Sequence, residues 1–255
     1  MKLFYRKLGI GKPIIIIHGL FGSSDNWLSI SKKLSDKYTI YLPDIRNHGQ
    51  SPHSSEHSYD LMVLDLLELI KDNNIEKPVI IGHSMGGKIS MNFAIDYPEI
   101  VDKIIVVDIA PKMYQHENRQ YIESLLAMDL EKINTRDDAE KMLIEKIPER
   151  AVRLFLLKNL YRKEDMSFGW KLNLDAIYNN IRELEGYTTD SCSKIEALFI
   201  QGELSKYILD SDYPIIKKVF PNSKIIKING AGHWIHAEKP NEVYDLIIKF
   251  LSSYT

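Results

Sequence analysis

The feature that most constrains the fold of this chain is the pentapeptide G-H-S-M-G at residues 82–86. It lies between an apolar run at residues 79–81 and a segment with apolar residues at helical spacing, residues 88–97. A strand, a sharp turn and a helix would place Ser84 at the apex of the turn and present its hydroxyl to a ligand. We expect the two glycines to sit where a Cβ atom would collide with the neighbouring strand or helix. Because a serine between two glycines is often only a turn, the pentapeptide alone allows a structural or a catalytic interpretation.

The length and composition fit one large α/β domain. A chain of 255 residues with 44% hydrophobic residues can bury a full-sized core. Its 33 Lys and Arg balance 35 Asp and Glu without a block of like charge, so nothing indicates a nucleic acid or an anionic membrane as partner. The apolar run at residues 14–17 is too short for a signal peptide or a membrane span, which predicts a soluble, cytoplasmic protein. A single cysteine, Cys192, excludes an internal disulfide and a cysteine-based zinc site.

Short apolar runs recur along the chain and predict parallel strands that are covered on both faces. Helical patterns lie between several of them, for example at residues 59–71 and 242–251. This alternation predicts an α/β fold with a doubly wound, mostly parallel sheet. The predicted strands are at residues 14–17, 38–42, 79–81, 104–107, 197–200 and 224–228.

The alternation breaks between residues 111 and 193, where charged helical patterns occur without a convincing strand. Thr135 is expected to begin one helix there, and Pro148 to occupy the first turn of the next. We therefore expect residues 111–193 to form an inserted helical cap on a core made of residues 1–110 and 194–255.

A serine hydroxyl is a weak nucleophile, so Ser84 would need a base within hydrogen-bond reach and an acid that orients the base. The best candidate for the base is His233, in the sequence G-A-G-H-W at residues 230–234. It follows the last predicted strand and precedes the last helix, in a loop whose glycines would let it reach the serine. The alternative is His236, whose position near the helix start favours a structural role.

The other histidines have simpler explanations. His18, at the end of a strand, and His83, inside the turn, are expected to make local hydrogen bonds. His48 lies in an ordered loop, and His57 and His116 are expected at the surface. Because the His, Asp and Glu residues do not cluster at metal-ligand spacing, the sequence predicts no metal site.

Two segments could supply an oxyanion hole, which needs backbone N–H groups directed at developing negative charge. The first donor is the amide of Met85, directly after Ser84 at the start of a helix whose dipole favours an anion. The second lies in the sequence H-G-L-F-G at residues 18–22, with Leu20 as the donor and Phe21 as the alternative.

With these motifs the chain resembles the α/β-hydrolase-fold serine hydrolases of the small, capped bacterial and mitochondrial esterase type. The resemblance covers nearly the whole length and depends on four motifs in a fixed order. Two of its segments resemble one branch of these esterases, which acts on short acyl esters or thioesters. They are R-N-H-G at residues 46–49 and V-D-I-A-P at residues 107–111. The four motifs are H-G-L-F-G at 18–22, D-I-R-N-H-G-Q-S at 44–51, G-H-S-M-G-G at 82–87 and G-A-G-H-W at 230–234.

The acid departs from the commonest pattern of this family. Most relatives carry it after the strand that is here predicted at residues 197–200, but the following loop has Ser205 where an aspartate is usual. Asp108 is the preferred candidate, because some relatives carry their acid at that strand end and the order nucleophile, acid, base is kept. Ser205 would then be an auxiliary hydrogen-bonding group near His233. The competing acids are Glu203, Asp210 and Asp212.

The resemblance implies a serine hydrolase that cleaves carboxylic esters or thioesters of short to medium acyl chains, without a cofactor. Ser84, Asp108 and His233 would form the triad, and Phe21 and Trp234 would contact the small-molecule substrate. Two alternatives remain open: a lyase or carbon–carbon-bond hydrolase on the same scaffold, and a ligand-binding receptor that retains the triad. The sequence does not identify the physiological substrate or the oligomeric state.

Overall fold

A seven-stranded sheet forms the centre of the computed structural model, which describes residues 1–114, 118–185 and 191–252. The strand order is β1-β3-β2-β4-β5-β8-β9, and every neighbouring pair is parallel except β1 with β3. Each predicted apolar run falls within one of the parallel strands, so the doubly wound, mostly parallel sheet is confirmed. The strands are β1 (Tyr5–Leu8), β2 (Lys12–Ile17), β3 (Tyr38–Pro43), β4 (Val79–His83), β5 (Lys103–Val107), β8 (Glu196–Gly202) and β9 (Ser223–Ile228).

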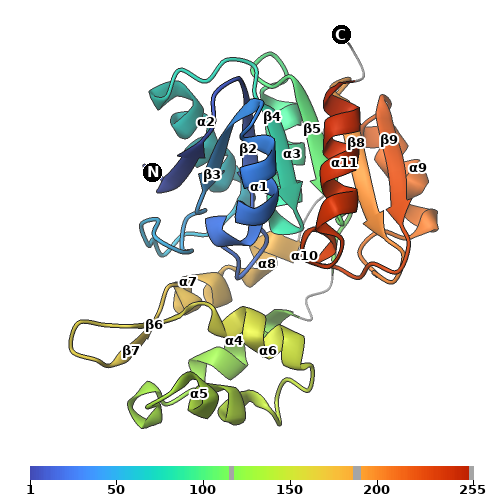
Figure 1. Ribbon diagram of the computed structural model, residues 1–255. Helices are drawn as coiled ribbons and strands as arrows, with labels where there is room; N and C mark the ends of the chain where they lie inside the picture. The colour runs from blue at the N-terminus through green and yellow to red at the C-terminus, as the bar shows by residue number, and fades with distance from the viewer. Residues whose placement is uncertain (115–117, 186–190, 253–255) are drawn as a thin grey trace.

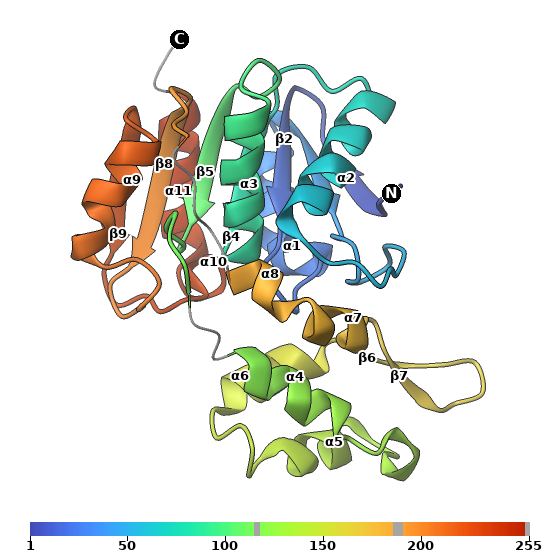
Figure 2. The ribbon, with the colours of Figure 1, turned by 180° about the vertical axis from the view of Figure 1, so that it is seen from behind.

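Helices cover both faces of the sheet, as Figures 1 and 2 show from opposite sides. Along β2, Ile14 and Ile16 pack into the cluster beneath α1 and α11, whereas Ile15 and Ile17 pack into the cluster beneath α2, α3 and α9. This two-sided burial explains why the strand reads as a continuous apolar run. The helices are α1 (Leu28–Leu34), α2 (Tyr59–Asp72), α3 (Met85–Asp96), α9 (Tyr213–Val219), α10 (Ile235–Glu238) and α11 (Pro240–Leu251). Both α2 and α11 lie where the sequence predicts helices.

The antiparallel edge strand β1 was not among the predicted strands. Its side chains are half-buried or exposed, and it pairs only with β3. Arg6 and Lys7 place two positive charges on this edge, which is a common protection of an edge strand against pairing with another chain.

Between β5 and β8 the chain leaves the sheet and forms a group of short helices with one hairpin. Figures 1 and 2 place α4 to α7 beyond the ends of the parallel strands, with α8 closer to the sheet. The elements are α4 (Asn118–Leu126), α5 (Arg136–Leu143), α6 (Arg150–Leu157), β6 (Leu160–Arg162), β7 (Phe168–Trp170), α7 (Leu174–Asn179) and α8 (Ile181–Glu185). The division into a core and a cap of residues 111–193 stays a prediction.

Three local predictions in this segment can be compared with the structure. Thr135 caps α5 and accepts a hydrogen bond from the amide of Asp138, as expected for a helix start. Pro148 precedes Glu149, the N-cap of α6, so its predicted place in the first turn is wrong. The expected absence of strands is also wrong, because β6 and β7 form an antiparallel pair. Strands of three residues are too short to give a periodic signal.

The turn between β4 and α3 depends on close backbone contacts. Ser84 has φ 51° and ψ −115°, in a region that side-chain-bearing residues rarely adopt. A Cβ atom on Gly82 would lie 2.1 Å from the carbonyl oxygen of Gly86, and one on Gly86 would lie 2.5 Å from that of Ile17 on β2. The expected collisions with the neighbouring helix and strand are therefore confirmed. No helix in the described part of the chain is long and apolar enough to span a membrane.

We expect Gly86→Ala to destabilise the protein by about 1–3 kcal/mol, because the added methyl group meets backbone that cannot move aside. Gly169→Ala is the control, since its nearest obstacle is Cε of Lys163, near the far end of a flexible side chain. Urea unfolding of both variants measures the difference in the free energy of unfolding. An equal or larger loss for Gly169→Ala would contradict this explanation of the turn.

Candidate active site

Ser84 lies at the carboxyl edge of the sheet, at the start of α3. Its amide donates to the carbonyl of Val107 at 3.0 Å, which ties the turn to the end of β5. Its side chain lines two cavities of about 180 and 170 Å³. The hydroxyl is therefore open to small molecules from two sides.

Asp108, the first residue after β5, holds a fully buried carboxylate with three donors. Its Oδ2 lies 2.8 Å from Nδ1 of His233 and also accepts a hydrogen bond from the Ser205 hydroxyl. Its Oδ1 accepts from the amide of Gly202 at 3.0 Å. Hydrogen bonds from three directions compensate a buried carboxylate for lost hydration. The ends of β5 and β8 and the loop after β9 thus meet at one side chain.

The competing acids are held elsewhere. Glu203 accepts a hydrogen bond from a glycine amide at an exposed turn, and the other two form ion pairs with lysines. Of the four candidates, the structure places Asp108 beside His233. The rival contacts are Glu203 with Gly230 at 2.7 Å, Asp210 with Lys227 at 2.7 Å and Asp212 with Lys112 at 2.6 Å.

Contacts of the ring and of the backbone orient His233. The ring stacks on Tyr207 with centroids 3.8 Å apart, and its carbonyl oxygen accepts a hydrogen bond from Nε2 of His83 at 2.9 Å. Because Nδ1 donates to Asp108, Nε2 is left as the acceptor. His233 and Ser84 line the same cavity, although among the described residues no hydrogen bond joins the Ser84 hydroxyl to His233.

His236, the alternative base, lies in a different environment. Its ring is buried and stacks on Trp27 with centroids 4.5 Å apart. Burial lowers the pKa of His236 to about 3, with a smaller contribution from the neighbouring His233. Such a ring accepts a proton poorly at neutral pH, so the environment favours a structural role.

In the loop after β2 the backbone amide of Phe21 is already engaged, although Phe21 itself lines the smaller cavity. The amide of Phe21 donates to Nε2 of His48 at 3.2 Å, and its carbonyl accepts from Asn159 at 2.8 Å. Leu20 lines both cavities together with Ser84, and Met85 lines the larger one at the start of α3. Because the Phe21 amide donates to His48, it is the weaker alternative, and the Leu20 and Met85 amides stay the predicted oxyanion donors.

His48 has a role that the sequence analysis missed. Its Nδ1 donates to the carbonyl of Arg46 at 2.9 Å, which makes Nε2 the acceptor for the Phe21 amide. Burial, with the neighbouring histidines, lowers the pKa of His48 well below its ordinary value, so the ring stays neutral as this acceptor role requires. The expectation that His57 is a surface residue is wrong, because its side chain is fully buried. His116 lies outside the described residues.

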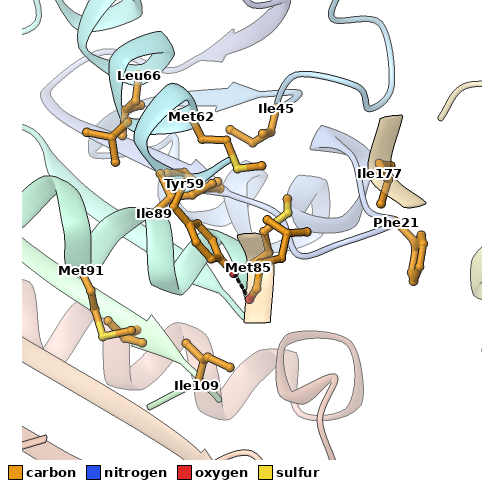
Figure 3. Close-up of a cluster of buried hydrophobic side chains, with 14 of the residues drawn as sticks. Phe21, Ile45, Tyr59, Met62, Leu66, Met85, Ile89, Met91, Ile109 and Ile177 are labelled. Carbon is orange, nitrogen blue, oxygen red and sulfur yellow. Dashed lines mark hydrogen bonds between the residues drawn. The ribbon is translucent and has the colours of Figure 1, made fainter. Parts of the chain in front are cut away.

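The two cavities differ in lining. Phe21 and Trp234, the predicted substrate contacts, line the smaller cavity with His233 and two further aromatic rings of the helical segment, Tyr121 and Phe155. The larger cavity lies at the start of α3 and is also lined from the first residue of α2, the segment after β5, α4, α8 and the loop after β8. Its lining includes Tyr59, Met85 and Ile109, which are labelled in Figure 3. In residues 1–114, 118–185 and 191–252, no group of three or more His, Cys, Asp and Glu could hold a metal ion.

Comparisons with known proteins agree with this arrangement. Residues 12–128 match the family model of the alpha/beta hydrolase fold. The chain is 40% identical over 252 residues to the sn-1-specific diacylglycerol lipase ABHD11 of Danio rerio, which covers 95% of this chain and 79% of that protein. It is 32% identical to the esterase YbfF of Escherichia coli, over 94% of this chain and 93% of that protein.

A solved structure extends the agreement to three dimensions. The marine microorganism esterase superposes with a TM-score of 0.95 at 45% identity, over 98% of this chain and 99% of that one. The mostly parallel sheet, the serine turn and these relatives give one conclusion: the chain belongs to the α/β-hydrolase fold family, as a carboxylesterase-type hydrolase.

Proposed function

We propose that this protein hydrolyses carboxylic esters or thioesters through an acyl-enzyme on Ser84, with His233 as the base and Asp108 as the acid that orients it. The observation that carries the proposal is the 2.8 Å contact between His233 Nδ1 and the buried Asp108, in a loop that brings His233 into the same cavity as Ser84. Nucleophile, base and acid of this kind are recognised by geometry and role.

The reaction follows from the proton positions. With Nδ1–H donated to Asp108, Nε2 of His233 takes the proton of Ser84 as the hydroxyl attacks the carbonyl carbon. The Leu20 and Met85 amides stabilise the oxyanion, each worth a few kcal/mol in the transition state. His233 then gives its proton to the departing alcohol or thiol, and water cleaves the acyl-enzyme by the reverse sequence. A hydrogen bond from serine to histidine commonly tightens only when substrate is bound.

The size of the larger cavity supports a short acyl group. A cavity of about 150 Å³ in a protein core holds a benzene ring, so about 180 Å³ suits an acyl group of roughly six to eight non-hydrogen atoms. One relative, ABHD11 of Danio rerio, is named as a diacylglycerol lipase, which indicates a lipid substrate for that protein. We place the preference of this chain at shorter acyl groups.

Ser84→Ala should lower kcat for 4-nitrophenyl butyrate by about 10⁴-fold or more, because the covalent route is lost. Ser124→Ala is the control, since the hydroxyl of this serine on α4 donates to the Gln120 carbonyl of its own helix, and the substitution should leave kcat unchanged. The assay measures released nitrophenolate in both variants and the wild type. Near-normal turnover by folded Ser84→Ala would exclude Ser84 as the nucleophile.

Asp108→Asn should lower kcat by about 10³–10⁴-fold while the fold is kept, because an amide no longer holds the productive tautomer of His233. Glu203→Gln removes a charge of the rival loop and should change kcat by less than about threefold, in line with its exposed position. Steady-state kinetics on a butyrate ester compare the two. A larger loss in Glu203→Gln than in Asp108→Asn would reassign the acid.

A trapped acyl-enzyme separates ester hydrolysis from lyase chemistry on the same scaffold. Rapid quenching during turnover of a butyrate ester should give a protein mass increased by one butyryl group, located on the peptide that contains Ser84. Loss of this adduct in Ser84→Ala is the control. Turnover of the ester without any such adduct under burst conditions would count against a covalent intermediate.

A further inference from the structure

A buried asparagine of the helical segment between β5 and β8 holds the loop that carries the Leu20 amide. Asn159 lies between α6 and β6 and is 3% exposed. Its Nδ2 donates to the carbonyl of Phe21 at 2.8 Å and to that of Leu156, on its own helix, at 3.1 Å. Because both neighbours are carbonyl oxygens, the amide nitrogen must face them. The bond to Phe21 joins residues that are 138 positions apart in the sequence, and the reaction as proposed makes no use of it.

Two peptide groups connect this side chain to the Leu20 amide. The carbonyl of Phe21 shares a planar peptide group with the amide of Gly22, which donates to the carbonyl of Gly19 at 2.9 Å. The Gly19 carbonyl in turn shares a peptide group with the Leu20 amide. In a trans peptide the C=O and N–H bonds point in opposite directions, so a carbonyl that is held also fixes the direction of the N–H. Asn159 therefore acts on the Leu20 amide through this chain of hydrogen bonds.

Phe21 is the strained residue of the loop, which makes the bond from Asn159 important. Its φ is 62°, in a region that residues with a side chain rarely adopt. Such a conformation persists only where the surroundings hold it. Here the amide of Phe21 donates to His48 and its carbonyl accepts from Asn159, so both polar groups of the backbone are held. Without the Asn159 donor, the peptide group between Phe21 and Gly22 is free to rotate.

A second donor at the Gly19 carbonyl keeps the loop folded. Nε2 of His18 accepts a hydrogen bond from the amide of Ile45 at 3.0 Å, which leaves Nδ1 to donate to the Gly19 carbonyl at 2.8 Å. Burial lowers the pKa of His18, so the ring stays neutral and this tautomer is kept. Loss of the Asn159 donor should therefore misalign the Leu20 amide without unfolding the loop.

From these contacts we infer that Asn159 is a positioning residue of the oxyanion hole, which aligns the Leu20 amide with the developing negative charge. The inference rests on the proposed ester hydrolysis, in which Leu20 supplies one of the two donors. The same helical segment lines the smaller cavity with Tyr121 and Phe155. The segment that surrounds a bound ester thus also sets one donor for its transition state.

Asn159→Leu keeps a similar side-chain volume and removes the donor. Complete loss of an oxyanion donor costs about 10²–10³-fold in kcat, so misalignment of one should lower kcat for 4-nitrophenyl butyrate by about 10-fold or more. KM should change by less than about threefold, because the lost interaction belongs to the transition state.

Asn180→Leu is the matched control. Nδ2 of Asn180 also donates to a carbonyl of its own helix and to one of the core, those of Ala176 and Ser55, both at 2.8 Å. The bond to Ser55 lies at the protein surface, in the loop after β3. This variant should keep kcat within about threefold of the wild type.

Two ketones of equal chain length separate oxyanion alignment from a general loss of structure. The Ser84 oxygen adds to the carbonyl carbon of 1,1,1-trifluoro-2-hexanone, its proton passes to His233 and the ketone oxygen becomes an oxyanion, whereas 2-hexanone binds without stable addition. Asn159→Leu should raise the inhibition constant of the trifluoro ketone by about the factor by which kcat/KM falls. That of 2-hexanone should change by less than about threefold. Inhibition constants do not depend on the fraction of the enzyme that is folded.

An unchanged inhibition constant for the trifluoro ketone, or an equal increase for both ketones, would overturn the inference. If Asn159→Leu does not fold, Asn159→Ala, which adds neither bulk nor charge, is measured in the same way with the same expected results. Turnover of the butyrate ester by the wild type together with either overturning result leaves the proposed function intact. No turnover by the wild type would overturn both.

Discussion

The buried carboxylate of Asp108 is the contact on which the candidate site depends. A carboxylate without water costs several kcal/mol unless donors replace its hydration. Here the donors come from three segments that are far apart in sequence: Gly202 at the end of β8, Ser205 in the next loop and His233 after β9. They meet because β5, β8 and β9 are neighbouring parallel strands whose carboxyl ends share one edge of the sheet.

Ser84 is joined to the same strand by its backbone. The amide of Ser84 donates to Val107, the residue before Asp108, while the amide of Asp108 donates to Ile200 on β8. Ser84 and Asp108 both have positive φ, at 51° and 53°, so each is held in a conformation that a residue with a side chain rarely adopts. The paired sheet ends stabilise both strained residues at once. The sheet itself therefore sets the positions of Asp108 and Ser84, whereas His233 comes from the loop after β9.

Sequence patterns predicted those parts of the molecule whose physical cause is local or repetitive. The parallel strands followed from continuous apolar runs, and the Thr135 cap from a local capping pattern. The sequence did not predict the edge strand β1 or the hairpin of β6 and β7, since exposure and short length remove the periodic signal of a strand. The sequence did not predict the long-range contacts either. The burial of His57 and the hydrogen bond from Phe21 to His48 depend on loops that only the folded chain brings together.

Lys88, which is buried on α3, illustrates why such a residue is invisible in a sequence pattern and informative in a structure. Lysine is a good helix former that usually lies in solvent, so the sequence of α3 does not predict that Lys88 is buried. An apolar side chain of similar length at this position could pack between Tyr59 and Tyr114 without losing the hydration of a charge. The helix α3 begins at Met85, so its dipole favours negative charge beside Ser84, and Lys88 lines the same cavity one turn further along the helix.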